Sequence, residues 1–236
     1  MIYDIYENSR VGVNDIKLKN LLSELKQKKL SPVIRSFMPP TEIGSITLVD
    51  QIVLLSLAKL ISAQRIVEIG TYFGYSAALF AMNLNAHIFS IDLPKTNQKQ
   101  INFDEKLVHT DGNYNDDFLR SKQNNKREIY LDYLTDKERK NISLVKADST
   151  SINFQEKFGS ADLVFIDGGH ERSIVEKDTN SARSIVKNGI IIWHDYGSVI
   201  HNDVQNFLLD QKDRKIFHVL SSLCAFELIR NEEHLS

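Results

Sequence analysis

Short apolar runs alternate with more polar segments along most of the chain. Runs rich in Ile, Val, Leu and Phe predict strands at 65–70, 86–93, 142–148, 161–167 and 189–195. Helices are predicted at 47–62, 76–84 and 171–187. The last of these helices is expected to end at Asn188 and Gly189, a pair typical of a helix C-cap.

The order of these elements predicts the fold class. Strands that alternate with helices form a parallel sheet covered on both faces. After a helix near 202–211, the runs KIFHVL and LCAFELIR lie too close together for a helical crossover, so they are expected to pair antiparallel. We therefore predict an α/β protein with a Rossmann-like doubly wound sheet of seven strands, mostly parallel with an antiparallel C-terminal strand.

Two segments fall outside this alternation. Residues 14–30 predict an amphipathic helix, and the prolines at 32, 39 and 40 break helical structure after it. We expect residues 1–44 to form an N-terminal helical extension or lid and residues 45–236 to form the main domain. Residues 95–141 are too many for one crossover helix, so this polar segment is expected to hold that helix and an insertion over the site.

Composition narrows the possible partners. A length of 236 residues suits one domain with a modest extension, and a net charge of −2 offers no basic field for nucleic acid. The apolar stretch 46–63 is interrupted by Asp50, Gln51 and Lys59, so no membrane span is expected. The N-terminus does not have the pattern of a signal peptide, and the single Cys224 fits a reducing compartment, so we expect a cytoplasmic protein.

The first strand end that carries candidate chemistry is VEIGTYFGYS, at 67–76. In a doubly wound sheet, ligands bind at the carboxyl ends of the strands. Gly70 and Gly74 allow a ligand to approach the backbone closely, and Glu68 can lie near an amino group or a cation. The glycine spacing is not G-x-G-x-x-G, which weakens a dinucleotide interpretation. The alternative is a tight turn between a strand and a helix.

The next two strand ends also present carboxylates. Asp92 closes FSIDLP and can accept hydrogen bonds from ribose hydroxyls. Asp148 and Ser149 follow the strand at 142–148 and can face an adenine edge. Each aspartate can instead be a turn or N-cap residue.

The last two strand ends combine carboxylates with imidazoles. DLVFIDGGHE places His170 three residues after Asp167, across two glycines, and IIWHDYG places His194 beside Asp195. Histidine titrates near neutrality and suits the role of a general base. The alternatives are that His170 caps the helix at 171–187 and that Asp195 is a turn aspartate.

Together these motifs resemble the class I S-adenosylmethionine-dependent methyltransferases. The E-I-G-T-x-x-G-Y-S form is similar to the catechol and caffeoyl-CoA O-methyltransferases. The D-G-x-H motif followed by H-D-Y resembles the small-molecule and sugar O-methyltransferases of the macrocin type. The resemblance covers roughly residues 45–230 and rests on motifs that occur in order at successive strand ends.

This resemblance implies a set of cofactor-binding residues. It assigns the methionine part of S-adenosylmethionine to Gly70 and Gly74, the amino group or loop ordering to Glu68, the ribose to Asp92 and the adenine to Asp148 with Ser149. Asp167 is also expected among the cofactor-binding residues. The residues implied at the glycine loop are Gly70, Thr71, Tyr72, Gly74 and Ser76.

The resemblance also implies a metal site in the metal-dependent members, here at Asp167, His194 and Asp195. Mg²⁺ prefers oxygen ligands, whereas an imidazole suits Mn²⁺, Zn²⁺ or Fe²⁺ better. The histidine therefore departs from the family pattern. It can also point away, which would leave the two aspartates with water.

The resulting hypothesis is an O-methyltransferase that acts on a hydroxyl of a small molecule or sugar. A neutral hydroxyl is a poor nucleophile and needs a base to take its proton or a metal to lower its pKa. His170 is expected to be the base, and Asp195 is expected to be a second catalytic residue. A divalent metal can assist them. The alternatives are a non-catalytic protein that binds S-adenosylmethionine and an NAD-dependent oxidoreductase. The helix at 14–30 can pack on its own domain or on a second copy, and of the two we favour a homodimer.

Overall fold

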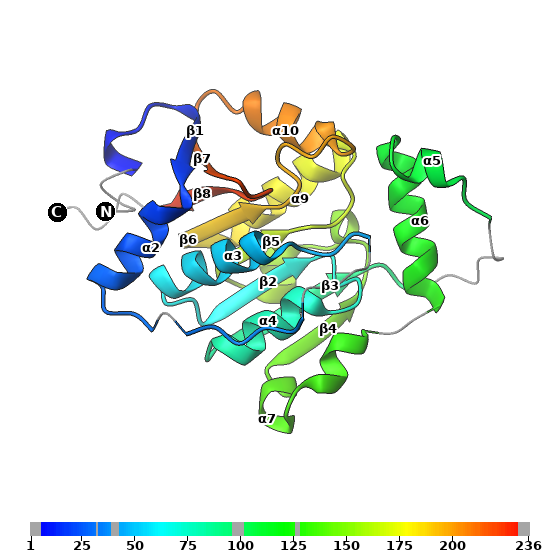
Figure 1. The fold of residues 1–236 in the computed structure, drawn as a ribbon, viewed down its shortest axis with the longest axis horizontal. Helices are drawn as coiled ribbons and strands as arrows, with labels where there is room; N and C mark the ends of the chain where they lie inside the picture. Colours follow the sequence, from blue (N-terminus) through cyan, green and yellow to red (C-terminus); the bar gives the residue numbers. More distant parts are fainter. Residues whose placement is uncertain (1–5, 32, 39–42, 96–101, 126–127, 231–236) are drawn as a thin grey trace.

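The computed structural model describes residues 6–31, 33–38, 43–95, 102–125 and 128–230. Within them, eight strands form a single sheet in the order β1-β7-β8-β6-β5-β2-β3-β4 (Figure 1). All neighbours pair in parallel except β8, which runs antiparallel to both β6 and β7. The predicted α/β class, the doubly wound sheet and the antiparallel C-terminal strand are confirmed.

The elements follow one another along the chain with these bounds: β1 Gly12–Lys17, α2 Leu18–Gln27, α3 Leu48–Leu60, β2 Arg65–Ile69, α4 Tyr75–Asn83, β3 His87–Asp92, α5 Glu105–Val108, α6 Gly112–Asn125, η1 Ile129–Tyr133, α7 Asp136–Arg139, β4 Ile142–Lys146, η2 Ser149–Ser151, α8 Phe154–Phe158, β5 Ala161–Ile166, α9 Arg172–Ile185, β6 Val186–Trp193, α10 Asn202–Leu209, β7 Lys215–Leu220 and β8 Ala225–Ile229.

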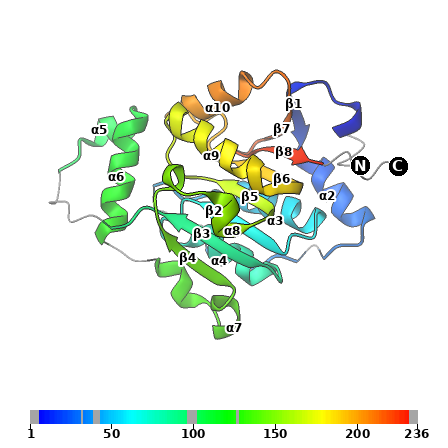
Figure 2. The same cartoon turned by 180° about the vertical axis from the view of Figure 1, so that it is seen from behind.

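Both faces of the sheet are buried. Along β5, Leu163 and Phe165 pack in the core beneath α2, α3 and α4, whereas Val164 and Ile166 pack in the core beneath α8, α9 and α10. Figure 1 shows the first group of helices in front of the sheet, and Figure 2 shows the second group from behind. A strand that is buried on both sides is apolar throughout, which explains the continuous apolar runs in the sequence.

The order of the strands locates the site. The chain builds β2, β3 and β4 toward one edge and then returns to the other side of β2 with β5. Connections diverge at this switch point, so a crevice opens at the carboxyl ends of β2 and β5.

The N-terminal segment differs from the prediction. We expected a helix over 14–30 and seven strands, but residues Gly12–Lys17 form β1, an eighth strand that pairs in parallel with β7. Only Leu18–Gln27 is helical, and its Leu21 and Leu25 share a core with α3. The helical spacing of the leucines was interpreted correctly, but the helix begins only after β1. The division of the chain at residue 44 stays a prediction.

The predicted C-cap at Asn188 and Gly189 is wrong. Helix α9 ends at Ile185, β6 begins at Val186, and both residues lie inside β6. The pairing of β5 with β6 shifts register between Ala161 and Leu163. A Cβ on Gly189 would lie 2.0 Å from the carbonyl oxygen of Asp162, so this glycine allows a close approach of two backbones rather than a helix end.

The long segment between β3 and β4 contains α5, α6, η1 and α7. Figures 1 and 2 show α5 and α6 beside each other, to one side of the sheet. Among the described residues, no helix is long and apolar enough to cross a membrane.

The close approach at Gly189 predicts a stability effect. Gly189→Ala should lower the free energy of unfolding by about 2–3 kcal/mol, because the added methyl group meets backbone that cannot rotate away. Urea denaturation should show a lower midpoint with an unchanged slope. Lys187→Ala, an exposed change in the same strand, is the control and should stay within about 0.5 kcal/mol of the wild type. Equal stability of the two variants would contradict the close approach.

Candidate active site

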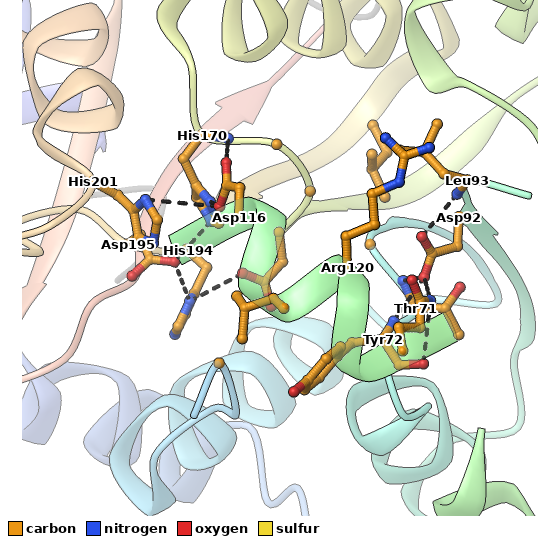
Figure 3. A pocket seen from close by; sticks show the side chains of 18 of the residues that line it. Thr71, Tyr72, Asp92, Leu93, Asp116, Arg120, His170, His194, Asp195 and His201 are labelled. Carbon is orange, nitrogen blue, oxygen red and sulfur yellow. Dashed lines mark hydrogen bonds and ion pairs between the residues drawn. The ribbon is translucent and has the colours of Figure 1, made fainter. Parts of the chain in front are cut away.

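A cavity of about 890 Å³ lies at the carboxyl ends of the central strands, with α6 along one side (Figure 3). This volume suits a nucleoside-sized ligand together with a second small molecule. Most of the residues predicted from sequence line it: Gly70, Thr71, Tyr72, Ser76, Asp92, Asp148, Ser149, Asp167, His170, His194 and Asp195. Glu68 and Gly74 are not among the lining residues.

The glycine loop is fixed by close packing. Gly70 has φ of 98°, and a Cβ there would lie 2.0 Å from the carbonyl oxygen of Asp167. Only glycine allows both the backbone conformation and this approach. Gly74 has φ of 80° and starts α4, where it packs against Leu131 of η1 rather than facing the cavity.

Glu68 lies behind the loop. It is fully buried and accepts a hydrogen bond from Ser90, whose hydroxyl also lies 2.8 Å from that of Thr71. Burial raises the pKa of Glu68 to about 8, although hydrogen bonds from Ser76 and Ser90 oppose the shift. This position fits the predicted role in ordering the loop better than a direct contact with a ligand.

Asp92 ends β3 and ties the loop to α6. Its Oδ2 accepts hydrogen bonds from the backbone N–H groups of Thr71 and Tyr72, at 3.0 and 2.8 Å, and from the side-chain amide of Gln123. Its Oδ1 accepts the backbone N–H of Leu93 at 2.7 Å (Figure 3). The carboxylate therefore organises the loop and at the same time faces the cavity.

Asp148 lines the cavity and also caps η2. Its carboxylate accepts hydrogen bonds from the backbone and hydroxyl of Thr150, at 2.9 and 2.7 Å, and from the hydroxyl of Ser151 at 3.1 Å. The hydroxyl bond from Thr150 is the main cause of the lowered pKa of Asp148. The capping role that we considered from sequence is therefore present, and it holds the start of η2 beside the cavity.

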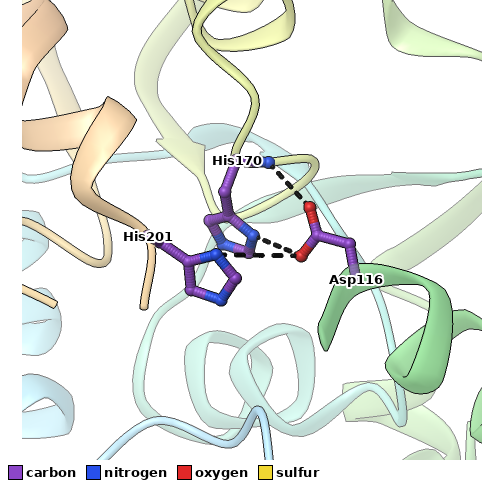
Figure 4. A group of neighbouring side chains, drawn as sticks. All are labelled: Asp116, His170 and His201. Carbon is purple, nitrogen blue, oxygen red and sulfur yellow. Dashed lines mark hydrogen bonds and ion pairs between the residues drawn. The ribbon is translucent and has the colours of Figure 1, made fainter. Parts of the chain in front are cut away.

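His170 lies between two carboxylates from different parts of the chain. Its Nδ1 is 2.7 Å from Oδ1 of Asp116 on α6 (Figure 4). Its Nε2 is 3.0 Å from Oδ2 of Asp195, which Figure 3 also labels. Burial alone would lower the pKa of His170, but Asp116 and Asp195 outweigh it and raise this pKa to about 10. The imidazole is therefore protonated at neutral pH in this arrangement, and the base role needs the ring to lose that proton first.

His201 stacks on His170. The ring centroids are 3.7 Å apart, and Nδ1 of His201 lies 4.0 Å from Oδ1 of Asp116 (Figure 4). Burial and the neighbouring His170 lower the pKa of His201, so this ring stays neutral when His170 is charged.

His194 is surrounded by carboxylates. Its Nδ1 lies 3.1 Å from Asp167 and 3.2 Å from Asp195, and its Nε2 lies 3.4 Å from Asp50 of α3. Burial opposes a charge on the ring, but Asp167 and Asp195 raise the pKa of His194 well above its ordinary value. Burial also opposes the charge on Asp50, but His194 and several hydrogen bonds lower its pKa to about 2.

The backbone at Asp195 is also unusual. Its φ is 60°, in the left-handed region, and this conformation directs the carboxylate between His194 and His170. Non-glycine residues in such conformations are often found at functional sites.

Asp167 and Asp195 can hold a divalent ion: their carboxylates and a ring nitrogen of His170 offer ligand atoms that all lie within 4.8 Å of one another, and Nδ1 of His194 faces the same two carboxylates. The carboxylate oxygens of Asp167 and Asp195 lie 3.1 and 3.2 Å from Nδ1 of His194. Two ligand atoms that bind the same metal ion are about 3 Å apart. Two oxygens and one imidazole nitrogen suit Mn²⁺, Zn²⁺ or Fe²⁺, and a carboxylate such as Asp50 on the other nitrogen is typical of a metal-bound histidine. Nδ1 of His194 can therefore carry either a proton or a metal ion.

Sequence reasoning missed three contributors. Asp116 and Gln123 lie in a segment where nearly every residue is polar, so no apolar stripe marks the face turned to the site. Asp50 gave a signal that could have been used, because it is a carboxylate within the otherwise apolar helix α3 and is fully buried.

The strand order and the loop at the strand ends define a Rossmann-like α/β protein with a cavity at the switch point of its sheet. The sequence family described as "Methyltransferase domain" matches residues 67–196, more than half of the chain. The chain therefore belongs to this methyltransferase family. No protein with a curated description matches the sequence.

Solved structures agree on the fold. Cofactor-bound Rv0187 from MTB aligns with a TM-score of 0.55 and 14% identity, over 91% of this chain and 90% of its own. SAH-bound PaMTH1 from Podospora anserina aligns with a TM-score of 0.54 and 13% identity, over 98% and 94%. The O-methyltransferase TomG from Streptomyces achromogenes, solved with SAM, aligns with a TM-score of 0.51 and 16% identity, over 98% and 96%.

The position of Asp116 predicts the protonation of His170. In the wild type, the His170 ring should titrate near pH 10, and in Asp116→Asn the pKa should fall because a charge is removed while a hydrogen-bond acceptor remains. NMR titration of the imidazole Cε1–H signals measures both values. His87, at the opposite end of β3 from the cavity, serves as an internal reference. An unshifted His170 in the variant would show that Asp116 does not control its charge.

Proposed function

We propose that the protein is an S-adenosylmethionine-dependent O-methyltransferase that acts on a hydroxyl of a small molecule or sugar. The observation that carries the proposal is the arrangement in one cavity of a glycine loop, a strand-end carboxylate at Asp92 and a cluster of imidazoles and carboxylates around His170. Membership of the methyltransferase family supports the reaction class. Two structural neighbours were solved with SAM and SAH bound, which supports the cofactor.

In this proposal the cofactor extends along the strand ends. Its methionine part would lie at the loop of Gly70, its ribose at Asp92, and its adenine near Asp148 and Ser149, all of which line the cavity. The sulfonium methyl group would then face His170 and Asp195. The carboxylates of this region would attract the cationic sulfonium and so favour cofactor binding, and this attraction is lost as the charge disappears in the transfer.

The chemistry is a displacement at carbon. The acceptor oxygen forms a bond to the methyl carbon while the sulfur–carbon bond breaks, and the electron pair stays on sulfur. The hydroxyl proton must go to a base, and we assign this role to His170. The ring can accept the proton only after it has lost its own, and it then returns to the charged state that Asp116 and Asp195 stabilise.

A divalent ion would be held by Asp167, His194 and Asp195. When bound, it would lower the pKa of the acceptor hydroxyl and so lessen the demand on the base. The same three side chains would then place the acceptor oxygen next to His170, since Asp195 contacts both imidazoles.

Calorimetric titration with S-adenosylhomocysteine tests the cofactor. The wild type should bind it and should not bind NAD⁺, because the loop lacks the dinucleotide glycine pattern. Asp92→Ala should weaken binding by at least about tenfold, because a charged acceptor for the ribose is lost. Repeating the titration with EDTA shows whether a metal contributes.

The same titration can reject the proposal. Binding of NAD⁺ but not of the thioether would indicate an oxidoreductase. Binding of the thioether without turnover of any acceptor hydroxyl would leave a non-catalytic binding protein.

A further inference from the structure

One face of α6 is turned into the cavity. Asp116, Arg120 and Gln123 are separated by four and three residues, so they lie on the same side of the helix. Asp116 contacts His170 at one end of this face, and Gln123 contacts Asp92 at the other. Arg120 therefore lies between these two contacts, over the middle of the cavity. Along the helix it is one residue closer to Gln123 than to Asp116.

Arg120 has a free guanidinium. It lines the cavity, its Nε is buried, and no hydrogen bond or ion pair is found for it among the described residues. Of the described residues that line the cavity, it is the only arginine or lysine. A buried guanidinium nitrogen without a partner is costly, which indicates that a ligand completes its surroundings.

The side chain extends toward the ends of β3 and β4. Figure 3 shows Arg120 reaching from α6 in the direction of Leu93. The described lining of this end consists of small or aliphatic and polar residues, namely Leu93, Ala147, Asp148, Ser149 and Thr150, without an aromatic ring. A flat ligand placed here would have aliphatic contacts on one side and would need a planar partner on the other.

We propose that Arg120 covers the adenine ring of the cofactor by stacking its guanidinium plane on the purine. The inference rests on the proposed function, because it takes the cofactor to be an adenine nucleoside. Guanidinium groups are planar and weakly hydrated, and they stack on base faces. The insertion helix would then contribute to cofactor binding directly, through a residue outside the strand-end motifs.

The experiment compares two ligands and three variants by calorimetry. S-Adenosylhomocysteine carries the amino-acid part, whereas 5′-methylthioadenosine has the adenine and ribose without it. Arg120→Ala should weaken both ligands by about tenfold, which is the usual effect of losing one stacking partner. Arg120→Lys keeps the charge and loses the plane, so it should weaken both ligands nearly as much.

A matched control removes a charge from the same helix. Lys122 is exposed and does not line the cavity, so Lys122→Ala should bind both ligands as the wild type does. Arg120 is itself only partly buried, so its variants should fold, and thermal unfolding checks this.

Three results would overturn the inference. Wild-type affinity in Arg120→Lys would mean that charge matters and not the plane. Weakening of the homocysteine ligand alone would place Arg120 at the amino-acid carboxylate. Wild-type affinity in Arg120→Ala would remove Arg120 from the cofactor site. If the wild type binds neither ligand, the proposed cofactor itself fails, which is a separate outcome.

Discussion

The site depends on a balance between a group of carboxylates, most of them partly buried, and two imidazoles. Asp116, Asp167 and Asp195 converge on His170 and His194, and the fully buried Asp50 lies behind His194. A buried carboxylate is tolerated when a positive charge compensates it, and for Asp50 this charge is carried by the His194 ring. These residues come from α3, α6 and the ends of β5 and β6. The same charge balance therefore joins the core of the sheet to the insertion.

This balance has a consequence for proton transfer. The carboxylates that hold His170 in place also favour its protonated form, so the ring is well oriented but has a proton to lose. A cation in the site would change this, because a sulfonium or a divalent ion near Asp195 competes with the imidazolium for the same negative charge. Ligand binding and the readiness of the base are therefore linked through Asp195, which contacts both imidazoles.

The sequence predicted what is local and missed what is long-range. The strand ends were identified because buried parallel strands are apolar and end at polar residues. The glycine loop was identified because Gly70 must be a glycine, since its backbone packs against the carbonyl oxygen of Asp167. Strand β1 was mistaken for part of a helix, since its pairing with β7 joins positions about two hundred residues apart. The contact of Asp116 with His170 spans 54 residues and follows from how the insertion folds back, which no local pattern encodes.

Asp92 shows how the insertion and the cofactor loop depend on each other. Its Oδ2 accepts three hydrogen bonds, from the backbone of Thr71 and Tyr72 and from the amide of Gln123, whereas its Oδ1 accepts one, from the backbone of Leu93. Each carboxylate oxygen has about two lone-pair directions, so Oδ1 has one left and Oδ2 is crowded. A ribose hydroxyl of the proposed cofactor would therefore be accepted at Oδ1, while Gln123 on Oδ2 keeps α6 beside the glycine loop. The helix that holds His170 through Asp116 is in this way anchored to the loop at its other end.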